Sequence, residues 1–427
     1  MEKIKEKLNM LHEKGLLYIF AGSFLTKAIS FFGSIFLVRA LSKFDYGILS
    51  YLDNIYGYVW ILAGMGMSNA VLRYVVREET LDGKFGRFQY AVKSGFVWNV
   101  GLIILGAVFN LVYPHPAEYK PYSWLLFILF ASLPFQYVSD NVLGNERAMF
   151  DNRRYALLAL TMSFSIIASK VIFGNLFGIR GAVISQACVY VCLAVFYYSG
   201  TRRKHYRNAK SAQVASPERK EINTYALQYM ITNGLWAIFM LNDIYLLGRF
   251  CQPEIVADYK VAYTIPGCVA LISSSIGIFV APYFVKNERN TAWVRKTYKT
   301  TFAATALLVG AICAFIQLLA KPLILWLYGE QYLPAVPVMR ILLLAAFFNC
   351  GLRYTTANIM AAMGKIKYNM VVSAIGTALQ IIINIFVIPR FGEYGVAYTS
   401  CFVYLVMAII LFVVFYIQYY KAPKLEQ

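Results

Sequence analysis

The chain has 427 residues, of which 59% are hydrophobic and 14% are charged. Its mean hydropathy of +0.57 excludes an ordinary soluble domain, because so apolar a chain needs lipid as its solvent. A net charge of +19 would suggest a nucleic-acid partner in a soluble protein, but here the basic residues lie in short segments between long apolar runs. We therefore expect a membrane protein with no nucleic-acid partner.

The start of the chain contains a charged segment and then an apolar run. Met1 to Lys14 places Ile4, Leu8 and Leu11 on one helical face, as in an amphipathic helix that lies on a membrane surface. The apolar run that follows is too long for the core of a signal peptide, and no small-residue cleavage site comes after it. We interpret this run as a retained first span.

Twelve apolar runs are long enough to cross a bilayer, which predicts an all-α polytopic membrane protein. The predicted spans are Leu16–Val38, Ile48–Met67, Ser94–Val112, Ser123–Leu143, Tyr155–Phe173, Ala182–Ser199, Thr224–Leu247, Val261–Val280, Thr301–Leu319, Val338–Ala357, Met370–Ile388 and Val396–Ile417.

The longest segment between two spans is basic and divides the chain into halves. We expect an N-terminal six-helix bundle over residues 1–199, a flexible cytoplasmic linker over 200–221 and a C-terminal six-helix bundle over 222–427. The amino terminus, the even-numbered loops and the carboxyl terminus carry 28 Lys and Arg, whereas the odd-numbered loops carry 8. This bias predicts that both termini lie in the cytoplasm.

The two halves contain a repeated sequence. Phe177–Ala182 comes before the sixth span and Phe391–Val396 before the twelfth, and the match continues without a gap to Tyr190 and Tyr404. Halves with an even number of spans have the same topology and are related by an axis along the membrane normal. Transporters with a substrate path between their halves are built in this way.

Cysteine and histidine residues indicate no further chemistry. Seven cysteines and three histidines form no CxxC motif and no Cys/His cluster. We expect no disulfide framework, no metal site and no cofactor.

Several short motifs of this chain resemble those of one superfamily. They are Lys27 in the first span, the run Val38–Gly47 after it, Gly64–Met67 and Ala70–Tyr74 around the end of the second span, and the repeated FGxxGA-type segment. In their order and spacing they resemble the polysaccharide flippase branch of the multidrug/oligosaccharidyl-lipid/polysaccharide exporter superfamily.

The resemblance implies a non-enzymatic flippase in the bacterial cytoplasmic membrane. It would move a polyprenyl-diphosphate-linked oligosaccharide from the inner to the outer leaflet by alternating access, for a surface polysaccharide such as lipopolysaccharide O-antigen or capsule. The implied fold is two six-helix bundles in a V around a central cavity. The implied partners are the lipid-linked oligosaccharide, membrane lipids, H⁺ or Na⁺, and polysaccharide polymerase or assembly proteins.

Two features depart from other members of the superfamily. Drug exporters often carry an acid in the first span, where this chain has Lys27, and the peptidoglycan-precursor flippase has two more helices than this chain can form. Lys27 argues against a drug or cation exporter, which stays an alternative. A membrane-embedded polymerase or glycosyltransferase would need a long external loop or a carboxylate cluster, and a non-transporting scaffold also stays open.

A polar stripe makes Lys27 the first candidate for substrate binding. Ser23, Lys27, Ser30 and Ser34 lie on one face of an otherwise apolar helix. A charge at bilayer depth costs about 2.5–3.5 kcal/mol and therefore needs a reason. An ammonium in this place could hold a diphosphate, or it could pair with an acid such as Asp53 and join two helices.

A second polar stripe lies along one face of the eleventh span and contains Gln380 and Asn384, together with Ser373 and Thr377. Its equivalent in the fifth span includes Lys170. These side chains could line a hydrated cavity and bind sugar hydroxyls, or they could join packed helices by hydrogen bonds.

Other charges within or beside the spans have two readings each. Arg353, four residues after Asn349, could attract phosphate at the inner mouth or snorkel to the interface, and we favour snorkelling. Arg73 stands at a span end, where snorkelling is usual, and only the family pattern makes it a candidate for substrate binding. Arg340, near an outer span end, is given a structural role.

The deepest acids, Asp53 and Asp243, are candidates for ion coupling or for neutralising a neighbouring base. Sequence alone leaves both readings open.

Overall fold

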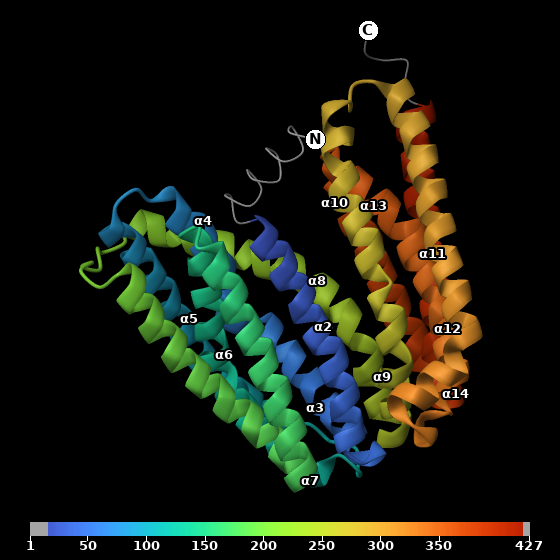
Figure 1. Cartoon of the computed structure of the whole chain (residues 1–427), viewed down its shortest axis with the longest axis horizontal. Helices are drawn as coiled ribbons and strands as arrows, with labels where there is room; N and C mark the ends of the chain where they lie inside the picture. Colours follow the sequence, from blue (N-terminus) through green and yellow to red (C-terminus); the bar gives the residue numbers. More distant parts are fainter. Residues whose placement is uncertain (1–15, 422–427) are drawn as a thin grey trace. The chain divides into compact units, whose positions relative to one another are not determined.

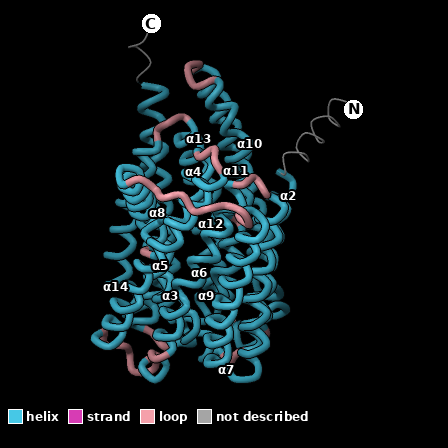
Figure 2. The backbone as a smooth tube through the Cα atoms, turned by 90° about the vertical axis from the view of Figure 1, so that its left-hand side faces the viewer, coloured by secondary structure: helices cyan, strands magenta, loops and turns pink. Residues whose placement is uncertain are grey.

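The computed structural model describes residues 16–421, so the amphipathic segment expected at Met1 to Lys14 lies outside the described residues. Helices make up almost all of this range, and no strand occurs within it (Figure 2). The helical elements are α2 (Leu16–Ala40), α3 (Lys43–Ile61), η1 (Ala63–Gly66), α4 (Met67–Arg77), α5 (Leu81–Val112), η2 (Lys120–Tyr122), α6 (Leu125–Ala148), α7 (Asn152–His205), α8 (Ser216–Phe250), α9 (Pro253–Cys268), α10 (Ala270–Lys286), α11 (Thr291–Tyr328), η3 (Glu330–Tyr332), α12 (Ala335–Ala346), the π-helical η4 (Phe347–Arg353), α13 (Tyr354–Ala362), α14 (Ile366–Tyr416) and the π-helical η5 (Ile417–Lys421).

The helices confirm an all-α, multi-pass membrane fold. Between residues 16 and 421, nine helices are long and apolar enough to cross a membrane, or ten if the bent pair of α3 and α4 counts as one span. Two of them, α7 and α14, have 54 and 51 residues. A straight helix of that length would measure about 80 Å, far more than the hydrocarbon core of about 30 Å. Each contains two predicted spans, and the count of twelve stays a prediction.

Glycines of the repeated motif break both long helices in the same way. Gly178 has φ 62° and ψ −151°, and Gly392 has φ 54° and ψ −132°, a region of backbone space that is essentially open to glycine alone. A second glycine follows three residues later in each motif. A Cβ added at Gly181 would lie 2.1 Å from the Phe173 carbonyl oxygen, and one added at Gly395 would lie 3.1 Å from the Val387 carbonyl oxygen. The repeat seen in the sequence is therefore a repeated turn that folds one helix closely against the next.

The predicted second span is bent rather than straight. Its two helices, α3 and α4, meet at an angle of 47°, and the turn between them contains the motif run Gly64–Gly66, whose three residues all have positive φ. The backbone N–H of Gly64 donates to Asn99 Oδ1 at 2.7 Å, and Trp98 Nε1 donates to the Leu62 carbonyl at 2.8 Å. These two α5 side chains satisfy backbone groups that the break removes from the helix ladder.

The chain divides by its contacts into two compact units, which we call unit 1 (up to Ala237) and unit 2 (from Ile238). The boundary lies inside α8, whereas the sequence placed it in the basic segment 200–221. That segment contains the end of α7, a connection over residues 206–215 and the start of α8. The start of α8 belongs to unit 1 because its side chains bond to α4 and α5: Tyr74 donates to Glu221 at 2.9 Å, and Tyr90 donates to Asn223 at 2.9 Å.

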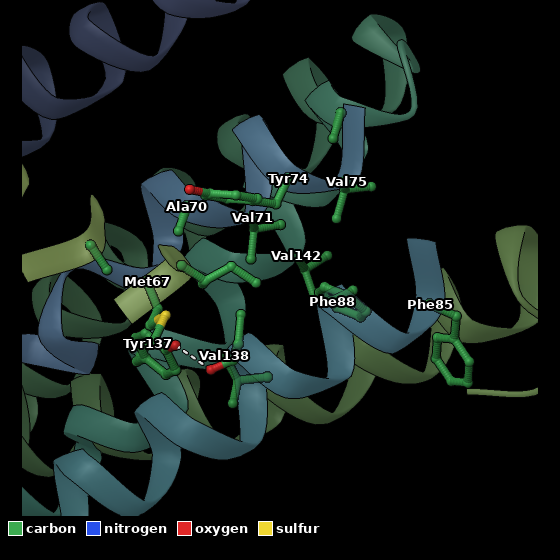
Figure 3. Close-up of a cluster of buried hydrophobic side chains, with 14 of the residues drawn as sticks. Met67, Ala70, Val71, Tyr74, Val75, Phe85, Phe88, Tyr137, Val138 and Val142 are labelled. Carbon is green, nitrogen blue, oxygen red and sulfur yellow. Dashed lines mark hydrogen bonds between the residues drawn. The ribbon is translucent and has the colours of Figure 1, made fainter. Parts of the chain in front are cut away.

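A buried apolar cluster holds unit 1 together beside this junction. Met67 and Val71 of α4 pack with Phe88 of α5 and with Tyr137 and Val142 of α6 (Figure 3). The Tyr137 hydroxyl donates to the Ala91 carbonyl at 2.6 Å, so the one polar atom of that side chain is satisfied inside the cluster. Figure 1 shows α5, α6 and α7 as neighbouring helices of this unit.

Loops of unit 1 gather at two ends. Phe44, after the first span, contacts Tyr122, after the third, with ring centroids 6.1 Å apart. The backbone N–H of Lys210, after the sixth span, donates at 2.9 Å to Asp82, which follows the second. Odd-numbered and even-numbered loops therefore contact members of their own group, as the alternating topology requires. Which end faces the cytoplasm stays a prediction.

Candidate functional site

The polar stripe of α2 is accessible. Ser23, Lys27 and Ser30 are all exposed, and Ser30 Oγ lies 3.2 Å from Ser163 Oγ of α7. Among residues 16–421, no acid forms an ion pair with Lys27. The alternative partner, Asp53, is bound elsewhere. Lys27 is thus an exposed cation on an apolar helix.

Asp53 pairs with Lys170 inside unit 1. Lys170 Nζ of α7 donates to Asp53 Oδ2 of α3 at 2.7 Å, and the side chains are 9% and 36% exposed. Asp53 Oδ1 is buried and has no hydrogen-bond partner within the described range. The pair joins two helices whose residues are 117 positions apart. Two residues predicted for separate roles, substrate binding and ion coupling, thus bind each other.

Asp243 of α8 lies in a cluster of uncharged donors inside unit 2. Gln380 Nε2 and Asn384 Nδ2 of α14 donate to its Oδ1 at 2.8 and 2.9 Å, and the Tyr259 hydroxyl of α9 donates to its Oδ2 at 2.8 Å. Gln380 and Asn384 are 2% and 0% exposed. No Lys or Arg of the described chain forms an ion pair with Asp243. Its carboxylate is held in position but not neutralised.

The partners of the two acids occupy equivalent positions in the repeat, although the acids themselves come from helices that are not equivalent. Lys170 comes eight residues before Gly178, and Asn384 comes eight residues before Gly392, so the repeat makes them equivalent. Each bonds an acid from another helix of its own unit. Unit 1 supplies a charged partner and unit 2 an amide. The structure therefore contains one acid with a cationic partner and one acid whose hydrogen-bond donors are uncharged.

The two amides that bind Asp243 each have an oxygen atom left over. Gln380 Oε1 and Asn384 Oδ1 are buried and have no hydrogen-bond partner within residues 16–421. The residues of this cluster therefore offer carboxylate, amide and hydroxyl oxygens, and no Lys or Arg is bonded to the carboxylate in the described range. Carboxylate and amide oxygens are what a proton or a hard cation prefers. The sequence analysis did not identify Tyr259 as a partner of Asp243, because the two residues lie on different helices.

Arg353 corrects one prediction. The favoured reading was snorkelling, but Arg353 is 5% exposed and lies in the π-helical turn η4. Its Nε donates to Asn349 Oδ1 at 2.7 Å, and its guanidinium lies 5.9 Å from the centre of the Tyr404 ring. Snorkelling is wrong because the π-helical turn holds the side chain among helices of unit 2. Arg73, in contrast, is exposed and lies 4.6 Å from the Tyr225 ring centre.

An unpredicted cluster joins α6 to both ends of α7. Glu146, Asp151 and His205 hold ligand atoms within 4.8 Å of one another, a spacing that could fit a metal ion. Cations already occupy the carboxylates: Lys204 donates to Asp151, and Arg154 lies 3.5 Å from Glu146. Burial alone raises the pKa of Asp151, but hydrogen bonds from Lys204 and the Arg154 backbone hold this pKa below its ordinary value. The arrangement fits an ion-pair network better than a metal site. Sequence reasoning missed it because Glu146 and His205 are 59 positions apart.

The fold is similar to that of solved membrane transporters. The structure is similar to the lipid II flippase MurJ in its inward closed conformation, with a TM-score of 0.74, 16% identity and coverage of 93% of this chain and 87% of that one. It is equally similar to an inward-facing multidrug resistance MATE transporter of the MOP superfamily, with a TM-score of 0.74, 17% identity and coverage of 94% and 96%. At these identities the likeness shows the fold, which is that of a MOP-superfamily transporter.

The family follows from sequence comparison. Residues 36–337 match the family described as polysaccharide biosynthesis protein, and the chain belongs to that family. It is 22% identical to an uncharacterized membrane protein of Methanocaldococcus jannaschii over 92% of this chain and 82% of that protein. It is also 22% identical to the teichuronic acid biosynthesis protein TuaB of Bacillus subtilis, over 56% of this chain and 49% of TuaB. The predicted resemblance to the polysaccharide branch of the superfamily is confirmed.

Proposed function

We propose that this protein is a non-enzymatic flippase that moves a polyprenyl-diphosphate-linked oligosaccharide from the inner to the outer leaflet. The family supplies the link to polysaccharide assembly, and the fold is shared with a lipid II flippase. An oligosaccharide diphosphate cannot cross hydrocarbon unaided, because its charges and hydroxyls would lose their water. Alternating access lets the head group stay solvated while the prenyl tail stays in lipid. A bacterial cytoplasmic membrane with both termini inside is part of the proposal.

One observation carries the proposal for the substrate: Lys27 is exposed, lies on a polar stripe and has no acid partner in the described part of the chain. A lone ammonium at bilayer depth is stabilised by an anion, and a diphosphate is a dense one. The neighbouring Ser23 and Ser30 add hydroxyl groups on the same face. Arg73 is also exposed and would serve as a second, peripheral contact.

Export assays on Lys27 variants test this role. In a strain that lacks its own flippase of this type, Lys27→Ala should abolish polysaccharide export at normal protein level, and Lys27→Arg should retain part of it. Lys321→Ala, which removes an exposed lysine from the end of α11, is the matched control and should export normally. Normal export by Lys27→Ala would overturn the proposed role, as would loss that is explained by low protein abundance.

We also propose Asp243, rather than Asp53, as the group that binds the coupling ion, H⁺ or Na⁺. Support comes from the contrast between the units: Lys170 neutralises Asp53, whereas uncharged donors hold Asp243. In proteoliposomes, Asp243→Asn should still exchange substrate between the leaflets but lose its response to a proton or sodium gradient. An unchanged response to both gradients would exclude Asp243 as the coupling group.

A drug or cation exporter is the second candidate, because the MATE transporter fits the fold as well as MurJ does. Expression in a drug-sensitive host separates the two candidates. Resistance to cationic drugs that survives Lys27→Ala would favour the exporter.

A further inference from the structure

A groove on unit 2 lies between α11, α12 and the part of α14 that follows Gly392. Its volume is about 460 Å³, and its polar lining residues are Gln317, Arg340 and Tyr398. The remaining lining is nearly all apolar and includes Leu344 and Phe347. Most of the apolar stretch of α11, which forms one side of the groove, is also left unburied. The groove therefore opens on a surface suited to lipid.

Arg340 is the unusual residue of this groove. It is exposed, although it lies in α12 only five residues after the helix begins at Ala335. No acid within residues 16–421 forms an ion pair with it, whereas Lys170 has Asp53. An unpaired cation near an apolar surface is stabilised by an anion from outside the protein. At about 1.5 Å of rise per residue, Arg340 is about 8 Å from the start of α12, within reach of a lipid phosphate.

Polar and apolar groups are separated along the groove. Gly310 of α11 is level with Phe347, the first residue of η4 after α12, because a Cβ added at Gly310 would lie 3.3 Å from the Phe347 ring. Gln317 comes seven residues after Gly310, and Arg340 comes seven residues before Phe347. In antiparallel neighbours these offsets bring Gln317 and Arg340 to the same level, about 10 Å from the apolar end. Gly310, without a side chain, widens that end.

We propose that this groove binds one anionic phospholipid of the membrane. Arg340 would hold the phosphate by charge-assisted hydrogen bonds, with the Gln317 amide and the Tyr398 hydroxyl as further donors. An acyl chain would lie along Leu344 and Phe347 over Gly310. The phosphodiester of a phospholipid carries one negative charge, which the single guanidinium of Arg340 would balance. The proposal is independent of the direction or substrate of transport.

Native mass spectrometry of the full chain in mild detergent tests it, with phosphatidylglycerol and phosphatidylcholine as probes. Wild type should retain one phosphatidylglycerol in preference to phosphatidylcholine. Arg340→Gln should weaken that binding about tenfold, equivalent to about 1.4 kcal/mol, because the hydrogen bonds to the phosphate would lose their charged donor. Gly310→Leu keeps the charge but fills the apolar end, and should also lose the lipid. Lys321 lies in α11, as Gly310 does, but does not line the groove. Lys321→Gln should therefore bind phosphatidylglycerol as wild type does.

Three results would overturn the proposal. One is equal retention of phosphatidylglycerol by wild type and Arg340→Gln, which would show that Arg340 only snorkels. Another is equal retention of the two phospholipids by wild type. The third is displacement of phosphatidylglycerol by polyprenyl phosphate at lower concentration, which would assign the groove to a prenyl lipid. Far-ultraviolet circular dichroism establishes that each variant is folded. If Gly310→Leu does not fold, the lipid binding of Arg340→Gln alone decides whether the proposal stands.

Discussion

Replacing Lys170 by Met should destabilise the protein, because Asp53 would lose its cation while remaining half-buried. At 2.7 Å, the direct attraction of the pair is about 6 kcal/mol for an effective dielectric constant of 20. Breaking a buried pair by removing one partner costs about 3–5 kcal/mol. Since the Asp53 side chain is 36% exposed, we expect the lower end of that range, about 3 kcal/mol.

Thermal unfolding of the purified protein in detergent measures this cost. Lys170→Met should lower the melting temperature by about 6–12 °C, from the scaling of about 2–4 °C per kcal/mol for domains of about 200 residues. The double variant Lys170→Met/Asp53→Asn should recover most of the loss, because no unpaired charge remains. Lys27→Met, which removes a lysine without an ion-pair partner among the described residues, should unfold as wild type does.

The same variants decide between a structural role and substrate binding for Lys170. If the ion pair is structural, export should fail with Lys170→Met and return with the double variant. The reasoning is refuted if Lys170→Met unfolds at the wild-type temperature yet loses export that Asp53→Asn does not restore. Lys170 would then act on the substrate, as the sequence analysis proposed.

Two further predictions concern the repeat and the topology. Gly178→Ala and Gly392→Ala should each destabilise the protein by about 1–3 kcal/mol, since no other residue favours their backbone conformation. Gly101→Ala is the control and should not destabilise the protein, because nothing lies within 4 Å of its added Cβ. Equal melting temperatures for all three variants would contradict the argument. Reporter fusions after His205 and after Gln331 should lie on opposite sides of the membrane, with His205 inside; the same side for both would refute the predicted topology.

Local chemistry explains what the sequence could predict. Hydropathy runs mark helices that lipid surrounds, and charge bias predicts their direction. The paired glycine motifs predicted a repeat, and Gly178 and Gly392 have nearly the same unusual backbone conformation. Periodicity also placed Ser23, Lys27 and Ser30 on one face of the first span, and all three are exposed. Each of these inferences depends on residues within one helix or one turn.

Tertiary structure decided which side chains meet. Sequence offered Asp53 as a partner for Lys27, but Lys170 binds it. Gln380 and Asn384 were seen as a stripe, yet nothing in the sequence showed that the stripe faces Asp243. Arg353 was expected at an interface and is buried at a π-helical turn. The periodicity of a helix fixes which of its residues share a face. The rotation of that face toward a neighbour, and the level at which two helices meet, depend on packing among helices far apart in the chain.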